Sequence, residues 1–295
     1  MPIFKRAKIA IITRTKNRPE LLRRCIRTVL NQNYQDWAHI IVNDGGDPKP
    51  INEIVEAHQK EYSGRCAVFH HERSLGMETA SNAGIKGSDS DAIVILDDDD
   101  TWAPSFLETC MSRLENKRHP SVRGVVTHAI QVLEKVIPGQ DLPVEVNRRP
   151  FNQYLRSISL SELSGGNIIT TNAFVYERNA LDEIGFYRED LPVLGDWEFN
   201  LRFVFQYEID LICESLSYFH HRIALHSGAS ANSVVAASSE HCFYATFILN
   251  EFLRKDLKSG KFGLGSVMNI HIQRRDIEKR FLLYRAIHWI KRKCS

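Results

Sequence analysis

Four consecutive aspartates, Asp97–Asp100, are the part of the sequence best suited to chemistry. They directly follow the most apolar of the predicted strands, Ala92–Leu96, so four carboxylates repel one another beside a low-dielectric core. A divalent cation offsets such repulsion, because hard cations prefer oxygen ligands. Residues i and i+2 of an extended segment point the same way, so Asp97 and Asp99 can face one ligand together. The alternative is a solvated acidic turn, or a helix cap ahead of Pro104.

Two further polar clusters follow apolar runs. Arg14, Lys16 and Arg18 come after the first run and can meet phosphates, although such cations are also common on solvated surfaces. Asp44 ends the second run. A carboxylate there can accept hydrogen bonds from a base or a ribose, or can simply form the turn before two glycines.

Hydrophobic patterning predicts the elements that position these clusters. Short apolar or β-branched runs predict buried strands at Lys8–Thr13, Trp37–Val42, Cys66–Phe69 and Ala92–Leu96. Helical spacing predicts helices between them at 21–30, Ile51–Tyr62 and Gly76–Lys86, with Asn17 as a candidate N-cap of the first. This alternation predicts an α/β fold with a mainly parallel sheet flanked by helices. Ligands of such sheets bind at the carboxyl ends of the strands, so the three polar clusters should converge there.

The second half is predicted to be more mixed. Strands are expected at Gly124–Leu133, Ile168–Tyr176, Ile209–Cys213 and Leu216–His220, and helices at Leu194–Gln206, Ala236–Leu257 and Ile270–Ile290. The segment Glu134–Arg149 has no periodicity, and we interpret it as a loop that can close over a ligand. We therefore expect one domain at 1–235, with halves at 1–120 and 121–235, and a C-terminal helical extension at 236–295.

The polar segments, in this order, resemble the family 2 glycosyltransferases of the GT-A fold. The usual family pattern is Thr-x-Asn-Arg, Ser-x-Leu-x-Gln, Asp-Gly-Ser, Asn-x-Gly and Leu-Asp-x-Asp-Asp. The matching segments are Thr15–Arg18, Thr28–Gln32, Asp44–Gly46, Asn82–Gly84 and Leu96–Asp100. Each match is weak alone, but the spacing agrees throughout residues 8–110, and a looser resemblance continues to about residue 230. The resemblance implies an inverting transfer of a sugar from a nucleotide-sugar donor, bound by the half at 1–120.

The resemblance also implies roles for the matching residues on the donor side. The implied nucleotide-sugar ligands are Arg14, Lys16, Asn17, Arg18, Asp44, Gly76, Asn82 and Asp98, with Asp98 and Asp44 at the ribose and the base. Asp99, helped by Asp97 and His226, is implied to hold Mn²⁺ or Mg²⁺, which neutralises the leaving nucleoside diphosphate. His226 follows Arg222 as in the corresponding family segment, although a lone histidine is more often structural.

On the acceptor side, a Gly-Phe segment followed by a Glu-Asp pair is the family pattern. Here Gly185-Phe186 precedes Gly195-Asp196, which implies that Asp196 is the general base for the acceptor hydroxyl. The alternative for Asp196 is a helix N-cap. Trp197 and Glu198 are candidate acceptor contacts, with a core position equally open for the tryptophan.

Four positions depart from the family pattern. Asn43 replaces the first Asp of the common Asp-Asp-Gly-Ser turn, and Gly46 replaces its Ser. Ser81 stands where an Arg often precedes the Asn. Gly195 replaces the Glu of the Glu-Asp pair. The implied base is kept, so these changes alter the expected contacts rather than the expected class.

Composition argues against a nucleic-acid-binding, a secreted or a membrane-spanning protein. The net charge is +2, from 38 basic and 36 acidic residues, and a nucleic-acid binder is usually far more basic. The six cysteines include no CxxC pair, so we interpret them as reduced thiols of a cytosolic protein. The N-terminal residues lack an apolar stretch, and no run approaches 18 apolar residues, so neither a signal peptide nor a transmembrane helix is expected.

The resemblance also implies partners. These are a UDP-, dTDP- or GDP-linked donor and a saccharide or lipid-linked acceptor, in bacterial surface polysaccharide synthesis. The stretch 274–293 is basic and amphipathic, so it suits either the inner face of the plasma membrane or a core or homodimer contact. One alternative is a non-catalytic nucleotide-sugar-binding scaffold. Another is a sugar-phosphate nucleotidyltransferase, against which the absence of glycine from Arg14–Pro19 argues.

Overall fold

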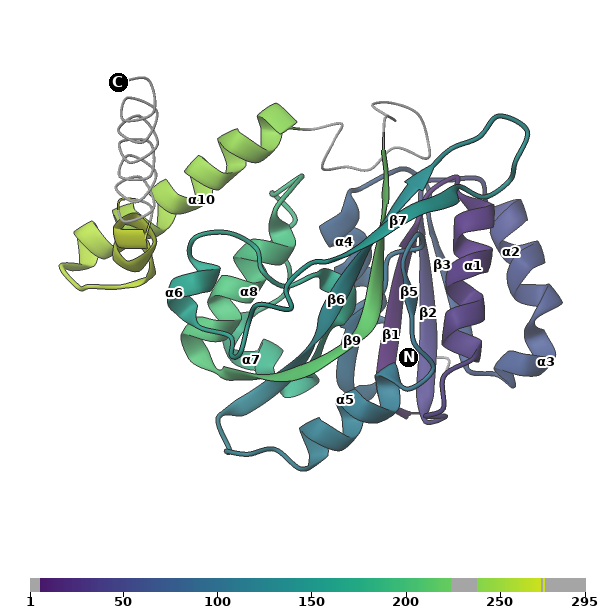
Figure 1. Ribbon diagram of the computed structural model, residues 1–295, viewed down its shortest axis with the longest axis horizontal. Helices are drawn as coiled ribbons and strands as arrows, with labels where there is room; N and C mark the ends of the chain where they lie inside the picture. Colours follow the sequence, from purple (N-terminus) through teal and green to yellow (C-terminus); the bar gives the residue numbers. More distant parts are fainter. Residues whose placement is uncertain (1–5, 224–237, 272, 274–295) are drawn as a thin grey trace, which may run out of the picture.

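The protein is described by a computed structural model for residues 6–223, 238–271 and 273 (Figure 1). Within these residues a nine-stranded sheet has the order β3-β2-β1-β4-β8-β6-β9-β5, and β7 pairs with β6 beside this path. The strands are β1 (Ala7–Thr15), β2 (Trp37–Asp44), β3 (Cys66–His71), β4 (Ser90–Ile95), β5 (Thr101–Trp102), β6 (Val122–Lys135), β7 (Val144–Pro150), β8 (Phe174–Glu177) and β9 (Glu208–Arg222). The helices are α1 (Pro19–Leu30), α2 (Pro48–Ala57), α3 (Gln59–Tyr62), α4 (Met77–Lys86), α5 (Phe106–Glu115), α6 (Leu160–Leu163), α7 (Leu181–Ile184), α8 (Gly195–Gln206) and α10 (Ser238–Ser259), with 3₁₀ turns η1 (Thr171–Ala173) and η2 (Arg178–Ala180).

The first half of the sheet is parallel, as the sequence predicted. Strands β3, β2, β1 and β4 are neighbours and all run the same way. Alternation along β1 sends Ile9 and Ile11 to one core and Ala10 and Ile12 to the other. Residues of α1, α2, α3 and α5 pack into the first core, and residues of α4, α6, α8 and α10 pack into the second. Helices therefore cover both faces of the parallel part of the sheet, which leaves the strand ends as the place for a polar site.

The second half extends the sheet with mixed directions. Strand β8 is antiparallel to β4 and β6, whereas β6 and β9 are parallel. The two predicted strands Ile209–Cys213 and Leu216–His220 form one strand, β9, whose register shifts opposite His128. Cys213 and Glu214 are exposed at this irregularity and interrupt the apolar pattern. The predicted strand at 168–176 is shorter in the structure, because η1 precedes β8.

The prediction of a loop over Glu134–Arg149 is wrong at both ends of that segment. Strand β6 continues to Lys135, and β7 returns antiparallel along it. Every residue of β7 is exposed, so no buried face imposes the apolar alternation that reveals a strand. The connection between the two strands is therefore shorter than the predicted loop.

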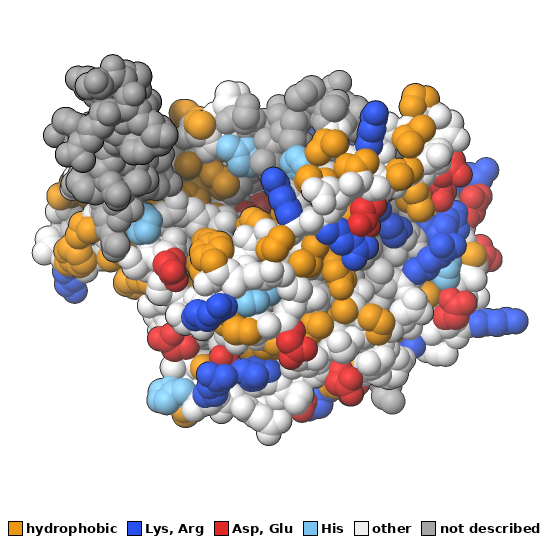
Figure 2. Space-filling view, viewed as in Figure 1, with side chains coloured by type: hydrophobic (Ala, Val, Ile, Leu, Met, Phe, Trp, Pro, Cys, Tyr) orange, Lys and Arg blue, Asp and Glu red, His pale blue; other side chains and the backbone are white. Residues whose placement is uncertain are grey.

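The described part of the C-terminal extension packs on the core that also contains residues of α4, α6 and α8. Ile248 of α10 is fully buried, and Leu264 and Met268 join the same core from a helical segment at 264–271. Most of the predicted helix Ile270–Ile290 and the whole basic stretch at 274–293 lie outside the described residues. No helix in the described ranges combines the length and the apolar character needed to cross a bilayer. On the face that Figure 2 shows, basic and acidic side chains are interspersed.

Candidate active site

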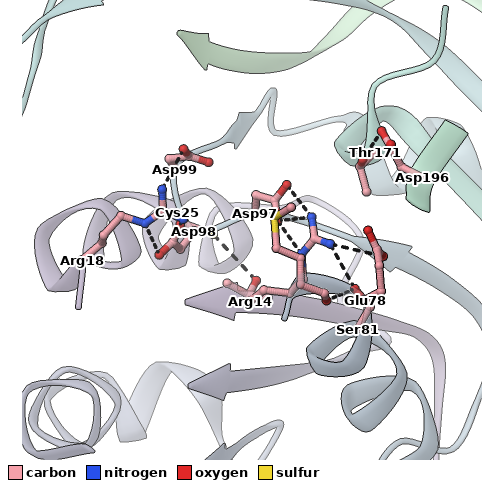
Figure 3. A network of polar contacts seen from close by, with 12 residues as sticks. Arg14, Arg18, Cys25, Glu78, Ser81, Asp97, Asp98, Asp99, Thr171 and Asp196 are labelled. Atoms are coloured by element: carbon pink, nitrogen blue, oxygen red, sulfur yellow. Dashed lines mark hydrogen bonds and ion pairs between the residues drawn. The ribbon is translucent and has the colours of Figure 1, made fainter. Parts of the chain in front are cut away.

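Arg14, near the end of β1, clamps the first residue of the acidic run (Figure 3). Its Nε and Nη2 donate to the two carboxylate oxygens of Asp97 at 2.7 and 2.8 Å, a bidentate pair that fixes both side chains. Its Nη1 donates to Ser81 Oγ at 3.3 Å and lies 3.7 Å from Glu78 Oε2. Burial alone would lower the pKa of Arg14, but the carboxylates of Asp97 and Glu78 outweigh it and keep the guanidinium charged.

Asp98 points into the protein rather than into open solvent. Its side chain is fully buried and accepts hydrogen bonds from Thr15 Oγ1 at 2.7 Å and from Arg18 Nε at 3.1 Å. Burial raises the pKa of Asp98, although the adjacent Arg18 opposes this shift. The turn after β1 and the acidic run after β4 are thus joined into one unit, as convergence at the sheet edge predicted.

Asp99 is held by arginines from three different elements. Arg18 Nη1 and Arg222 Nη2 donate to Asp99 Oδ2 at 3.3 and 2.5 Å, and Arg24 donates to the Asp99 backbone carbonyl at 2.7 Å. Burial would raise the pKa of Asp99, but Arg18 and Arg222 outweigh it and hold the pKa below its usual value. Asp99 is therefore charged at neutral pH.

Asp100 does not cap the next helix, which was one interpretation of its position. The N-cap residue of α5 is Ser105. The Asp100 carboxylate instead accepts a hydrogen bond from the backbone N–H of His220 at 3.0 Å, which ties the acidic run to β9.

Asp44 at the end of β2 is saturated by donors of the loop that leads to α4. His71 Nδ1 and the Leu75 N–H donate to Oδ1, both at 2.8 Å, while Ser74 Oγ and the Gly76 N–H donate to Oδ2 at 2.7 and 3.0 Å. Burial opposes the effect, but these four hydrogen bonds hold the pKa of Asp44 below its usual value. The structure thus joins two predicted donor ligands, Asp44 and Gly76, to each other.

The remaining predicted donor ligands differ in exposure: two lie on the surface and one is buried. Lys16 and Asn17 are exposed on the turn after β1. The predicted N-cap is wrong: α1 is capped by Arg18, because Asn17 adopts a left-handed φ of 54° and its Oδ1 accepts from the Asp47 N–H instead. Asn82 is buried, and its amide bonds the backbone of Tyr187 on both sides, which links α4 to the second half.

Asp196, in the first turn of α8, meets the donor side in one cavity of about 460 Å³. Arg14, Asp97 and Asp99 line the same cavity. Asp196 Oδ2 accepts hydrogen bonds from Asn167 Nδ2 at 2.7 Å and from Thr171 Oγ1 at 3.2 Å. Burial raises the pKa of Asp196, so this carboxyl is a stronger proton acceptor than an exposed one.

The two candidate acceptor contacts are engaged in the fold. Trp197 is 7% exposed, and its indole N–H donates to the Leu163 carbonyl at 2.8 Å. Glu198 is buried and pairs with Arg202 within α8 at 2.8 Å. His226, a predicted metal ligand, lies outside the described residues.

Sequence reasoning missed several residues of this site. Glu78 of α4 lines the cavity, as do His220 and His221 of β9. His220 Nε2 shares a hydrogen bond with Thr101 at 2.8 Å and Nδ1 contacts Glu134 at 2.8 Å, so it braces the strands under the acidic run. Glu78 had one signal: it precedes Ser81 and Asn82 by one helical turn, on the face that turns toward the sheet.

The carboxylate oxygens at the acidic run can supply some, but not all, of the ligands of a hard cation. Among the described residues, no group of three or more His, Cys, Asp and Glu side chains is arranged to hold a metal by itself. Both arginine contacts to the Asp99 carboxylate go to Oδ2, and Asp99 and Asp97 line the same cavity. Their oxygens therefore fit a divalent cation that takes its other ligands from substrate and water, as Mg²⁺ commonly does.

Comparison with solved structures identifies the fold. The solved structures that resemble this chain include TarS residues 1–349 of S. aureus in complex with UDP-GlcNAc, at a TM-score of 0.58 and 15% identity over 83% of this chain and 66% of that one. They also include the mannosyltransferase PcManGT from Pyrobaculum calidifontis in complex with GDP-Man and Mn²⁺, at a TM-score of 0.55 and 15% identity over 73% and 57% of the two chains. This chain thus matches less than two thirds of each solved chain, and the likeness establishes the GT-A fold that the sequence predicted.

The sequence comparisons establish the family. The model of glycosyl transferase family 2 matches residues 10–185, more than half of the chain, and the protein belongs to that family. The uncharacterized glycosyltransferase YwdF of Bacillus subtilis is 27% identical over 212 residues, 72% of this chain and 74% of its own length. WcaA of Escherichia coli, named for colanic acid biosynthesis, is 26% identical over 68% of this chain and 67% of its own. Family membership supports glycosyl transfer as the activity.

Proposed function

We propose that this protein is an inverting, metal-assisted glycosyltransferase. It moves a hexose-type sugar from a nucleotide-sugar donor to a hydroxyl of a saccharide or lipid-linked acceptor. One observation carries the proposal: Asp97 and Asp99 from the run after β4, and Asp196 from α8, line one cavity. Relatives named as glycosyltransferases, and solved neighbours with UDP-GlcNAc or GDP-Man in their titles, support it.

The donor is expected to lie along the ends of β1, β2 and β4, within the half at 1–120. Arg14, Arg18, Lys16 and Asn17 supply cations and an amide for the diphosphate at the turn after β1. The resemblance assigns the ribose and the base to Asp98 and Asp44, and Asn82 and Gly76 shape the wall through the contacts described above. Because Asp98 is fully buried, it acts on the ribose through Thr15 and Arg18, which it holds. Because Asp44 is already saturated by the loop at 71–76, its effect on a base is exerted through the backbone that it fixes.

The cation is expected at Asp99, with Asp97 beside it. When bound, Mn²⁺ or Mg²⁺ neutralises the charge that builds up on the leaving nucleoside diphosphate. The arginines on Oδ2 of Asp99 keep that carboxylate ionised and fix its direction. His226 stays a candidate ligand from the sequence.

Asp196 is expected to act as the general base. As the acceptor oxygen forms its bond to the anomeric carbon, its proton passes to Asp196. The bond from the anomeric carbon to the phosphate oxygen breaks, and its electron pair leaves with the nucleoside diphosphate. Attack from the side opposite the leaving group inverts the anomeric configuration. The hydrogen bonds from Asn167 and Thr171 orient the carboxylate for this step.

The acceptor is expected to enter from the half at 121–235. Relatives named for polysaccharide synthesis favour a bacterial surface polysaccharide as the product. We place the protein in the cytoplasm, with the C-terminal stretch at 274–293 available for a peripheral contact at the plasma membrane or for a homodimer. Vesicle binding with and without the residues from 270 onward tests the membrane contact.

Donor hydrolysis tests the proposal. A panel of UDP-, GDP- and dTDP-sugars is incubated with the protein, and nucleoside diphosphate release is followed with Mn²⁺, with Mg²⁺ and with EDTA. We expect release from one class of donor that depends on the cation and is lost in Asp99→Ala. Donor binding without any release, in the presence of either cation, would instead support the non-catalytic scaffold.

A further inference from the structure

Glu78 is a buried carboxylate of the cavity with an unsatisfied oxygen. It sits in the first turn of α4, is 4% exposed and lines the cavity that also holds Asp196. Its Oε2 has no hydrogen-bond partner among the described residues, since Arg14 Nη1 lies 3.7 Å away. A buried carboxylate oxygen without a donor is costly, so a polar ligand that reaches it is favoured there.

The carboxylate of Glu78 packs directly against Gly195 and fills the space that a side chain at position 195 would need. A Cβ atom added to Gly195 would lie 2.5 Å from both Cδ and Oε1 of Glu78. The φ of Gly195 is outside the left-handed region, so its backbone alone does not require glycine. This is the position where the family pattern has the Glu of a Glu-Asp pair. The carboxylate of Glu78 therefore lies where a side chain at 195 would begin.

A second departure from the family pattern is adjacent and follows the same logic. Ser81 stands where the family often has an Arg, and the guanidinium of Arg14 reaches it from β1, with Nη1 3.3 Å from Ser81 Oγ. The family pattern places a carboxylate on α8 and a guanidinium on α4. Here Glu78 supplies the carboxylate from α4, and Arg14 supplies the guanidinium from β1. Arg14 and Glu78 are also close to each other, so the two relocated charges keep their proximity.

We propose that Glu78 supplies from α4 the carboxylate that the family carries at position 195, and that it binds a hydroxyl of the transferred sugar. This rests on the function proposed above. The sugar must lie between the diphosphate at the acidic run and the acceptor hydroxyl at Asp196, because its anomeric carbon exchanges the phosphate oxygen for the acceptor oxygen that Asp196 deprotonates. Glu78 lies on the side of Arg14 toward Asp196 and away from Arg18 (Figure 3). A sugar hydroxyl is the donor that its Oε2 lacks.

The test returns the carboxylate to α8. The variants are Glu78→Ala, the swap Glu78→Ala with Gly195→Glu, and a matched control, Glu78→Ala with Gly195→Ala, which has the same backbone change and no carboxylate. Calorimetry measures the Kd of the nucleotide sugar that the wild type hydrolyses and, separately, of its nucleoside diphosphate, which has no sugar. The measurement is made at pH 8, where Glu78 is ionised, and loss of a hydrogen bond to a charged group weakens binding by about 10–100-fold.

We expect Glu78→Ala and the control to lose that factor for the nucleotide sugar and to keep the affinity for the nucleoside diphosphate. The swap should regain at least tenfold of the lost affinity. Equal affinities of the swap and the control, or an equal loss for both ligands, would overturn the inference.

Stability gives an independent readout of the same geometry. Gly195→Ala should lower the Tm when Glu78 is present, because the new Cβ meets its carboxylate, and should leave the Tm unchanged in the Glu78→Ala background. Equal effects in both backgrounds overturn the inference. An active wild type with a failed swap rejects the role of Glu78 alone, whereas a wild type that releases no nucleoside diphosphate from any donor rejects the proposed function and this inference with it.

Discussion

The two sides of the cavity hold their carboxylates in opposite ways. At the acidic run, each of three carboxylates is paired with arginine. Asp97 pairs with Arg14, Asp98 pairs with Arg18, and Asp99 pairs with both Arg18 and Arg222. Across the cavity, Asp196 is held by the neutral side chains of Asn167 and Thr171, and Glu78 Oε2 accepts no hydrogen bond from the described residues, with Arg14 Nη1 3.7 Å away.

This contrast suits the two tasks that a transferase combines. Arginine pairs fix the donor-side carboxylates in direction, and Arg18 and Arg222 keep Asp99 ionised, which a cation and a diphosphate require. Neutral partners leave Asp196 free to accept a proton without first breaking an ion pair, and burial raises its pKa toward the working range of a base. The donor side is therefore built for positioning and the other side for proton transfer.

Asp196→Asn should produce the largest change. The amide cannot take the acceptor proton, so we expect the transfer rate to fall by about 10²–10⁴-fold. Because asparagine keeps the shape of the side chain, the Tm should stay within a few degrees of the wild type. A rate within tenfold of the wild type, in a folded variant, would remove Asp196 from the mechanism.

Arg18→Ala should most strongly destabilise the donor side. It leaves the fully buried Asp98 without its cation, and breaking a buried ion pair on one side costs about 3–5 kcal/mol. The matched control is Arg23→Ala, which removes a half-exposed pair with Glu20 on the same helix and should cost at most about 1 kcal/mol. Urea unfolding of the two variants measures the difference, and similar losses would contradict the assigned role of the Arg18 pair.

The pH dependence of stability should reveal Glu78 on the other side. Burial raises the pKa of Glu78 from its ordinary 4.5 to about 7, against the opposing effect of Arg14. The folded state then keeps its proton to higher pH than the unfolded chain, so the stability contributed by Glu78 is full below about pH 4.5 and is lost as pH rises to about 7. Glu78→Gln should remove this decline.

The expected size is up to about 3 kcal/mol, since one pKa unit corresponds to about 1.4 kcal/mol. Unfolding free energies at pH 5, 6, 7 and 8 measure it as the difference between variant and wild type. The exposed Glu53 provides the control, and Glu53→Gln should leave the slope unchanged. An identical slope for Glu78→Gln and the wild type would show that this carboxyl is not protonated in the folded state.

A pair of glycine variants gives the smallest effect. Gly45 and Gly64 have φ values of 73° and 80°, so alanine strains the backbone at both, by about 1–2 kcal/mol. Only at Gly45 would the new Cβ meet backbone, 2.2 Å from the Ser74 nitrogen, in the loop that saturates Asp44. Gly45→Ala should therefore cost more than Gly64→Ala in thermal unfolding and should alone weaken donor binding. Equal unfolding costs would contradict the clash at Gly45, and equal donor affinities of the two variants would place the loop at 71–76 outside the donor site.

The sequence predicted most accurately those elements whose environment is repetitive. Strands buried on both faces appear as continuous apolar runs, and the four parallel strands were placed correctly for that reason. Strand β7 was missed because its side chains are all exposed, so only its hydrogen bonds to β6 define it.

At the site, the sequence indicated which turns converge but not which side chains pair. The spacing of the acidic run and of the Arg14–Arg18 turn placed both at one sheet edge, where the structure has them. The burial of Glu78 could not be predicted, because it depends on the approach of Gly195 from a distant part of the chain. The engagement of Asn82 with Tyr187 is equally long-range, and a single sequence carries no signal for it.

The most direct test separates the two sides by donor binding. Asp99→Asn and Asp196→Asn are compared by calorimetry for the hydrolysed nucleotide sugar in the presence of Mn²⁺, and by transfer or hydrolysis rate. We predict that Asp196→Asn binds the donor with an affinity within about twofold of the wild type while reacting at least 100-fold more slowly, and that Asp99→Asn loses donor affinity. Loss of donor affinity in both variants, or in neither, would contradict the division of the cavity into a donor-positioning side and a proton-accepting side.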